Sequence, residues 1–328
     1  MLIYERLITW YRCTFVNAIR DKQAFEDAIA ANDEGRFSDV LVALDPVLRR
    51  NPGNVFALPG RSFAFRNLNE MDAAWQDVSL AIELAPAYVD VLLNRGELGL
   101  LMQRFEQARI DFEKVIRLRP RNGEYHYRVA RCWHGLLEFT TAIQECQRAI
   151  DLGYKTEGCW EEKGSCHLEM MEWEAAWRCF NEAIQINTDD LLSIRGRGTA
   201  SAFLENYQAA LVDFHRYLDR EPDDVFALNN RCFCYLKLRS WSSAMQDLDR
   251  IFVIDSEFAP AWKNLAILQS QSSDWSFRDP IRAVESATKA MELSEWKATK
   301  WLPVLADAYE SAGDHAQAAV YRQRASGG

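Results

Sequence analysis

The chain has 328 residues and a formal net charge of −10, which argues against general nucleic-acid binding because that binding needs a basic surface to displace counterions. Its 48% apolar residues and 11 tryptophans suffice for a large core. No apolar stretch reaches the roughly 18 residues of a spanning helix, and Glu5 and Arg6 interrupt the first apolar run, so neither a membrane span nor a signal peptide is expected. The eight cysteines fit a reduced compartment, which predicts a cytoplasmic protein.

The first twenty residues stand outside the pattern that governs the rest of the chain. Their large apolar side chains lie on one helical face: Leu7, Trp10, Tyr11, Phe15 and Ile19. Residues 1–20 are therefore predicted to form an N-terminal capping helix that covers the first repeat, with an anchor on a membrane or a partner as the alternative.

From residue 21 onward the chain repeats with a period of 34 residues. One column of the repeat is alanine: Ala74, Ala108, Ala142, Ala176, Ala210 and Ala244. A second column holds small residues: Ala28, Ser62, Gly96, Ala130, Gly164, Gly198, Cys232 and Ala266. A third is aromatic apart from Met71: Phe37, Phe105, Phe139, Trp173, Tyr207 and Trp241. A fixed period of this length indicates stacked copies of one supersecondary element.

Each repeat is predicted to contain two helices joined by a short turn. In residues 89–122, two sets of apolar or small residues at helical spacing flank the polar pair Gln103 and Arg104: Leu92, Gly96 and Gly99, then Ala108, Phe112 and Val115. Pro120 ends the second helix because it has no N–H to donate. Gly96 and Ala108 carry so little side chain that the two backbones can approach closely.

The small residue at the eighth position, alanine at the twentieth, an apolar residue at the twenty-fourth and proline at the thirty-second resemble the tetratricopeptide repeat in its bacterial form. The departures are Val40 for alanine, and Tyr154, Thr188 and Ser256 for proline. The resemblance covers residues 21–325 and implies an all-α fold, a right-handed α-solenoid of about nine helix-turn-helix repeats. The predicted repeats lie near 21–54, 55–88, 89–122, 123–156, 157–190, 191–224, 225–258, 259–298 and 299–325.

The period slips once, because the step from Ala266 to Ala283 is five residues too long. The extra segment is placed in residues 274–280, and the role of its Trp275–Arg278 stretch is open.

Catalytic signatures are absent: there is no C-x-x-C pair, no H-E-x-x-H and no phosphate-binding loop. Four residues form the only conceivable soft-metal cluster, and packing within helices is the preferred explanation for them: Cys132, His134, Cys166 and His167. We therefore expect a non-enzymatic protein with no catalytic residues, no metal and no cofactor.

An arginine before the small position is accompanied by an aspartate sixteen residues later. The pairs are Arg61 with Asp77, Arg95 with Asp111, Arg197 with Asp213, and Arg231 with Asp247. The preferred interpretation is an ion pair that fixes the two helices of a repeat; a polar stripe for a ligand is the alternative.

In the family that the chain resembles, the first helices of successive repeats line a groove that binds extended peptides. The resemblance places a cationic and aromatic set with no acidic residue in the groove of repeats six to eight: Arg195, Phe203, Phe226, Asn229, Asn230, Phe233, Lys237, Lys263 and Asn264. The carboxylate clamp of chaperone-binding members is matched only in part, because Thr199 and Pro260 replace clamp residues.

These features predict a protein-interaction scaffold or adaptor that binds an extended or acidic peptide segment in this groove. The alternative is a ligand-sensing regulatory domain that closes around a small molecule or a signalling peptide. The sequence does not identify the partner, the pathway or the oligomeric state.

Overall fold

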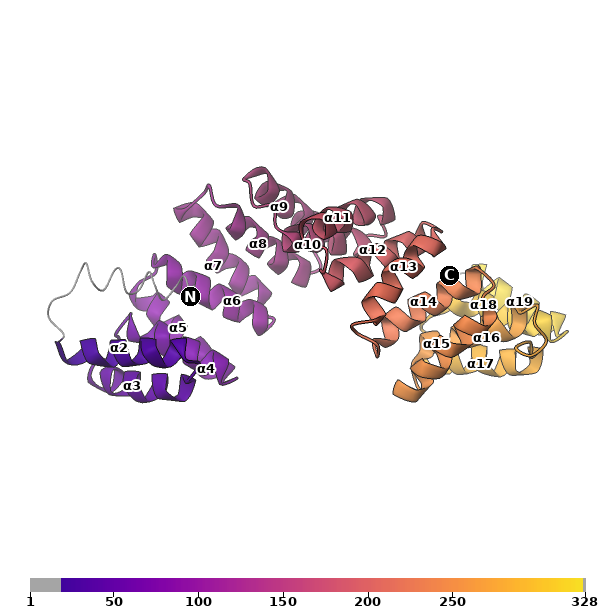
Figure 1. Ribbon diagram of the computed structural model, residues 1–328, viewed down its shortest axis with the longest axis horizontal. Helices are drawn as coiled ribbons and strands as arrows, with labels where there is room; N and C mark the ends of the chain where they lie inside the picture. Colours follow the sequence, from indigo (N-terminus) through magenta and orange to yellow (C-terminus); the bar gives the residue numbers. More distant parts are fainter. Residues whose placement is uncertain (1–18, 327–328) are drawn as a thin grey trace. The chain divides into compact units, whose positions relative to one another are not determined.

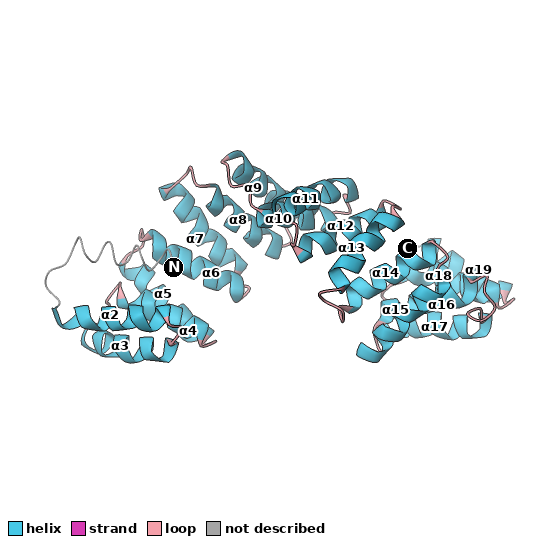
Figure 2. Ribbon diagram, in the orientation of Figure 1, coloured by secondary structure: helices cyan, strands magenta, loops and turns pink. Residues whose placement is uncertain are grey.

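The computed structural model describes residues 19–326, and every regular element in this range is a helix (Figure 1, Figure 2). The helices are α2 (Ile19–Asp33), α3 (Phe37–Arg50), α4 (Ala57–Asn67), α5 (Met71–Leu84), α6 (Val89–Leu101), α7 (Phe105–Leu118), α8 (Gly123–Gly135), α9 (Phe139–Asp151), α10 (Glu157–Glu169), α11 (Trp173–Ile186), α12 (Leu191–Phe203), α13 (Tyr207–Leu218), α14 (Val225–Lys237), α15 (Trp241–Ile254), α16 (Ala259–Gln271), α17 (Pro280–Leu293), the 3₁₀ helix η1 (Thr299–Trp301), α18 (Leu302–Ser311) and α19 (His315–Ser326). Within the described range these form nine consecutive helix pairs, which confirms the predicted all-α repeat fold. Of the predicted capping helix at residues 1–20, only Ile19 and Arg20 lie inside the described residues, where they begin α2.

The helices fall into two compact units. The N-terminal unit extends to Cys166 and contains α2–α9 with most of α10, and the C-terminal unit begins at His167 and contains the remaining helices. All nine candidate peptide-binding residues belong to the C-terminal unit, so that unit alone positions them.

The turn inside each of the first seven repeats closes in the same way. A residue with positive φ lies two positions after the end of the first helix, and these residues are 34 positions apart: Gly35, Asn69, Gln103, Leu137, Met171, Glu205 and Arg239. In the repeat at 89–122, the N–H of Arg104 donates to the carbonyl of Gly99 at 2.7 Å across this residue. Such a left-handed helix end satisfies carbonyls that the helix leaves unpaired, although it costs a non-glycine residue roughly 1–2 kcal/mol.

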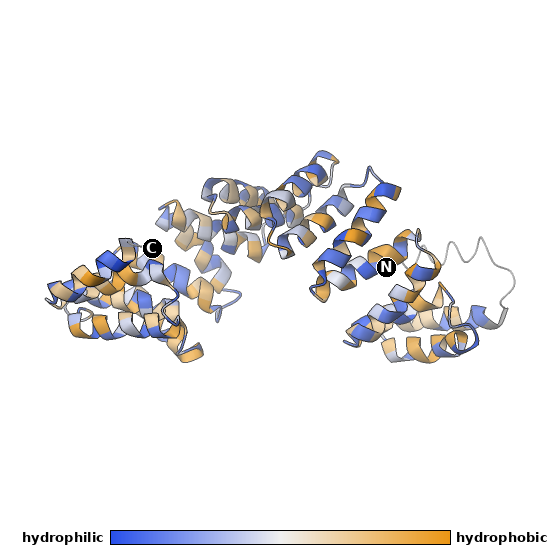
Figure 3. Cartoon of the chain, turned by 180° about the vertical axis from the view of Figure 1, so that it is seen from behind, coloured by the Kyte–Doolittle hydropathy of each residue, from blue (hydrophilic) through white to orange (hydrophobic). Residues whose placement is uncertain are grey.

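The repeated small residues form the centre of the core. All six members of the alanine column are 0% exposed, as are Ala28, Ala130, Cys232 and Ala266 of the second column. A Cβ built on Gly96 would lie 2.4 Å from the buried Phe112 ring, so this position needs glycine. Apolar and polar residues share each helix, as expected for helices that pack on one face (Figure 3).

The predicted arginine–aspartate pairs are ion pairs between the two helices of a repeat. In all four, the guanidinium Nε and Nη2 donate to the two carboxylate oxygens over 2.6–3.0 Å. The aspartates are buried, and Asp111 is 0% exposed. Both oxygens of each aspartate thus bind the arginine of the same repeat, as the ion-pair interpretation predicts.

The longer step in the period corresponds to the loop between α16 and α17. Asp274 holds a turn there by accepting from the N–H of Ser276 at 2.9 Å and from its hydroxyl at 2.7 Å. Asp279 then begins α17 by accepting from the N–H of Arg282 at 3.1 Å. Trp275 is 81% exposed, with the Arg278 guanidinium 5.3 Å from its ring centroid.

Candidate functional site

The candidate residues lie on α12, α14 and α16, the first helices of three successive repeats. Side-chain contacts join these helices laterally. The amide of Asn230 on α14 donates to the hydroxyl of Thr199 on α12 at 3.4 Å, and Asn264 on α16 donates to Oδ1 of Asn229 on α14 at 2.9 Å. The three helices therefore present one continuous row of side chains.

Two lysines converge on one aromatic ring in this row. The Nζ atoms of Lys237 and Lys263 lie 5.4 and 5.8 Å from the centroid of Phe233. Within residues 19–326, neither lysine forms an ion pair with a carboxylate. Burial, helped by the positive charges of Lys300 and Lys237 and opposed by Cys232, lowers the pKa of Lys263 to about 8. We call Phe233, Lys237 and Lys263 the lysine cluster.

Arg195 differs from these lysines because it already has an acidic partner. Its Nη1 lies 3.1 Å from Oδ2 of Asp224, and its guanidinium is 5.6 Å from the ring centroid of Tyr217. Asp224 also accepts from the Tyr217 hydroxyl at 2.8 Å and caps α14 through the N–H of Phe226 at 2.9 Å. Sequence reasoning missed Asp224 because it lies outside the positions that the family resemblance assigns to the groove.

Two of the three aromatic candidates, Phe203 and Phe226, have exposed rings. Phe203 is 54% exposed and stacks on Trp173 with centroids 4.1 Å apart, and Phe226 is 64% exposed with its edge toward Phe258. Phe203 and Phe226 both follow Arg195 in the chain and offer exposed apolar surface on α12 and α14. Aromatic side chains are enriched at interfaces between proteins.

The asparagines are less accessible than the sequence suggests. Asn264 is 0% exposed, and its Nδ2 donates to both Oδ1 and the main-chain carbonyl of Asn229. These contacts hold α16 against α14. Of the three asparagines, Asn264 is therefore buried between α14 and α16 and does not face a partner directly.

The family profile described as tetratricopeptide repeat matches residues 89–122. This is one full period of the pattern that the helix pairs repeat along the chain. The chain thus contains a tetratricopeptide repeat within a solenoid of helix pairs that share its period. A solved structure, the APC/C hetero-tetramer Cut9-Hcn1, superposes on 93% of this chain and 58% of that chain with a TM-score of 0.58. At 17% identity that likeness shows the fold.

Two curated relatives match parts of the chain. Stress-induced-phosphoprotein 1 of Caenorhabditis elegans is 19% identical over 196 residues, which are 50% of this chain and 61% of the relative. Hsp70-Hsp90 organizing protein 3 of Arabidopsis thaliana is 24% identical over 209 residues, which are 58% of this chain and 34% of the relative. The chain thus spans less than two thirds of the length of either. No helix within residues 19–326 is long and apolar enough to cross a membrane.

Proposed function

We propose that this repeat protein is a non-enzymatic scaffold that binds an extended, acidic segment of a partner protein along α12, α14 and α16. The observation that carries the proposal is the lysine cluster: Lys237 and Lys263 converge on Phe233 with no carboxylate partner among the described residues. In a chain of net charge −10, uncompensated cations on one face attract an acidic ligand.

The neighbouring side chains suit a ligand with apolar as well as acidic residues. Phe203 and Phe226 supply exposed rings, while Asn230 is half-buried on α14 and its amide donates to the Thr199 hydroxyl on α12. The name of one relative, Hsp70-Hsp90 organizing protein 3, agrees with a role in bringing proteins together. Arg195 contributes less than its charge suggests, because Asp224 already neutralises it.

Binding should be lost when the charge of the lysine cluster is reversed. We expect Lys237→Glu with Lys263→Glu to abolish binding of short peptides rich in glutamate and phenylalanine, measured by fluorescence anisotropy. Peptides with glutamine in place of glutamate should bind weakly to the unaltered protein. Raising the salt concentration should lower the affinity of the unaltered protein for the glutamate peptides, because partly exposed charges are screened.

The matched control reverses two exposed cations elsewhere in the same unit, Arg220→Glu with Lys289→Glu, and changes the net charge equally. It should leave binding intact. Circular dichroism of both double variants verifies that each is folded. Equal loss of affinity in the two would mean that net charge, and not the lysine cluster, governs binding; unchanged affinity in the first would exclude the cluster.

Affinity for the acidic peptide should also fall as the pH rises through about 8, where Lys263 loses its proton in the free protein. Because the charged form attracts the ligand, the affinity falls by up to about tenfold for each pH unit above that value. The charged or titratable groups that act on Lys263 are Cys232, Lys237 and Lys300. Lys263→Arg, whose guanidinium stays charged, should remove most of the dependence. A persistent dependence in that variant would assign it to another group.

A further inference from the structure

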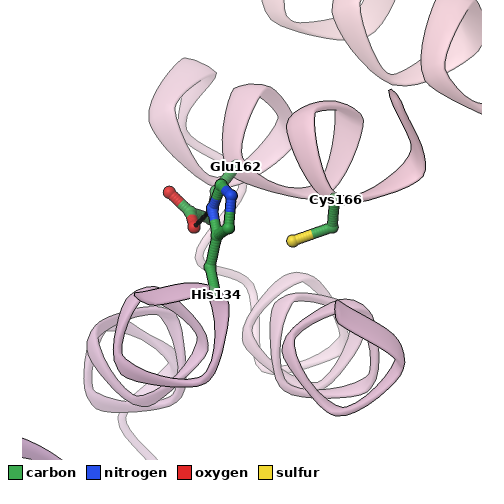
Figure 4. Close-up of side chains that lie close together, drawn as sticks. All are labelled: His134, Glu162 and Cys166. Carbon is green, nitrogen blue, oxygen red and sulfur yellow. Dashed lines mark hydrogen bonds and ion pairs between the residues drawn. The ribbon is translucent and has the colours of Figure 1, made fainter. Parts of the chain in front are cut away.

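A second cluster of polar side chains lies in the N-terminal unit, away from the candidate peptide-binding residues. His134 extends from α8 toward α10, which contributes Glu162 and Cys166 (Figure 4). One nitrogen of the imidazole, one carboxylate oxygen and the thiol sulfur all lie within 4.8 Å of one another. Nδ1 of His134 is 2.6 Å from Oε1 of Glu162. Within residues 19–326, no other group of three or more histidine, cysteine or acidic side chains meets this spacing.

The spacing on α10 makes this convergence possible. Glu162 and Cys166 are four residues apart, so both side chains leave the same face of the helix. Pairs of ligands at this spacing on one helix are a recurrent device for holding a metal ion. The third donor then has to come from a neighbouring helix, and His134 near the end of α8 supplies it.

The cluster is not a general feature of the repeat. Shifting the three positions by 34 or 68 residues gives the corresponding side chains between other neighbouring repeats. Toward the N-terminus they are Leu100, Arg128 and Cys132, then Arg66, Asn94 and Leu98. Toward the C-terminus they are Leu168, Gly196 and Ala200, then Ala202, Asn230 and Cys234. None of these offers three metal-binding side chains. Packing between repeats is therefore served by other residues, and it does not require an imidazole, a carboxylate and a thiol at one place.

The burial of the three side chains fits a site that is closed at its base and open at one side. Cys166 is 0% exposed, the Glu162 side chain is 13% exposed and the His134 side chain is 30% exposed. A carboxylate is costly to bury unless it is paired or coordinates a metal. His134 leaves a path by which an ion can reach the buried donors.

We propose that His134, Glu162 and Cys166 bind one Zn²⁺ ion. Nitrogen, oxygen and sulfur donors together suit this borderline-soft cation, and three protein ligands leave a fourth position for water or for a donor from a partner. The metal binds the thiolate, so the Cys166 proton leaves to solvent, together with the proton held between His134 and Glu162. The sequence alone predicts no metal here, since Glu162 has to be added to His134 and Cys166, while His167 pairs instead with Glu172 at 2.6 Å.

The ion has to compete with a proton for the imidazole. Hydrogen bonds with the Cys166 thiol and the Glu162 carboxylate raise the pKa of His134 to about 10. A bound metal replaces that proton as the positive charge between the two acceptors, so the arrangement of donors is retained. It also joins α8 to α10, the first helices of two successive repeats, and should stabilise that junction.

Titration of the purified, metal-free protein with Co²⁺ as a spectroscopic probe tests the site. We expect one equivalent to bind, with visible bands of tetrahedral cobalt and a thiolate-to-cobalt charge-transfer band, and Zn²⁺ to displace it. Cys166→Ser should abolish the charge-transfer band, and His134→Gln should weaken binding about a hundredfold or more, at least the loss seen when outer-shell partners of a metal site are removed. Cys132→Ser, which removes a buried thiol two residues from His134, and His167→Gln, which removes the neighbouring histidine, are matched controls that should bind as the unaltered protein does.

A second readout uses the unaltered protein and so does not depend on the folding of any variant. Zn²⁺ should increase hydrogen-exchange protection of α8 and α10 and leave α12, α14 and α16 unchanged. Failure to bind a stoichiometric ion, or binding without a change in α8 and α10, would overturn the proposal. So would a Cys166→Ser variant that keeps the spectrum, or loss of the spectrum in Cys132→Ser alone.

Discussion

Replacing the Arg95 guanidinium by an apolar group in Arg95→Met should lower the free energy of unfolding of the N-terminal unit by about 3–5 kcal/mol. This is the usual cost of leaving a buried charge without its partner. Arg95 and Asp111 are 12% and 0% exposed, and two hydrogen bonds of 2.7 and 2.8 Å join them. After the substitution, only Gln107 at 3.5 Å remains near one carboxylate oxygen. Denaturant unfolding measures the loss, and hydrogen exchange should place it around α6 and α7.

Two further variants show whether this loss comes from the burial of the unpaired Asp111 charge. Asp72→Asn breaks the ion pair with Arg104, in which Asp72 is 83% exposed, and should cost under about 1 kcal/mol. Replacing both partners, Arg95→Met with Asp111→Leu, should recover much of the loss because no unpaired charge remains. A double-mutant cycle without coupling energy would show that the contact contributes nothing beyond the separate side chains.

The fold is predictable from the sequence because a repeat shows its core positions many times over. The alanine column identifies buried crossings in six successive repeats, so no single substitution obscures it. The left-handed turn residue is not predictable in the same way. Gly35 and Asn69 are the members of that column whose type favours positive φ, whereas Leu137 and Met171 adopt it because the helices on both sides require it.

The candidate site is only partly predictable because contacts between repeats depend on residues that the period does not align. Phe233, Lys237 and Lys263 follow from positions in the repeat. The partner of Arg195 is Asp224, which lies 29 residues away, and Asn264 is buried by a contact with Asn229, 35 residues away. Likewise, Glu162 is one of several surface carboxylates in the sequence until the structure places it beside His134.

The contact of Gly196 with the preceding repeat is likewise not predictable from the period. The period identifies Gly198 as the small residue of its repeat, yet a Cβ on Gly196 would lie 2.4 Å from the ring of Phe180, while on Gly198 the nearest atom would be 3.1 Å away. Phe180 belongs to α11 of the preceding repeat, so the tighter contact is between repeats and not within one. A column of small residues in a single repeat cannot reveal it.

We therefore expect Gly196→Ala to destabilise the C-terminal unit by about 1–3 kcal/mol, because the buried Phe180 ring has no room to move aside. Gly198→Ala is the matched control. Both glycines lie inside α12, so both gain up to about 1 kcal/mol of helix propensity. The contact at Gly198, 3.1 Å from Cβ of Asp213, needs a much smaller adjustment than the 2.4 Å contact at Gly196. Gly198→Ala should change the free energy of unfolding by less than about 1 kcal/mol.

The ring itself can be tested by removing it. In a Phe180→Leu background, which is less stable on its own, Gly196→Ala should no longer destabilise and should stabilise by up to about 1 kcal/mol, since the clash is gone and the helix propensity remains. The sign of the alanine effect thus reverses with the identity of residue 180. If Gly196→Ala costs the same in both backgrounds, the contact with Phe180 does not set the spacing between these two repeats.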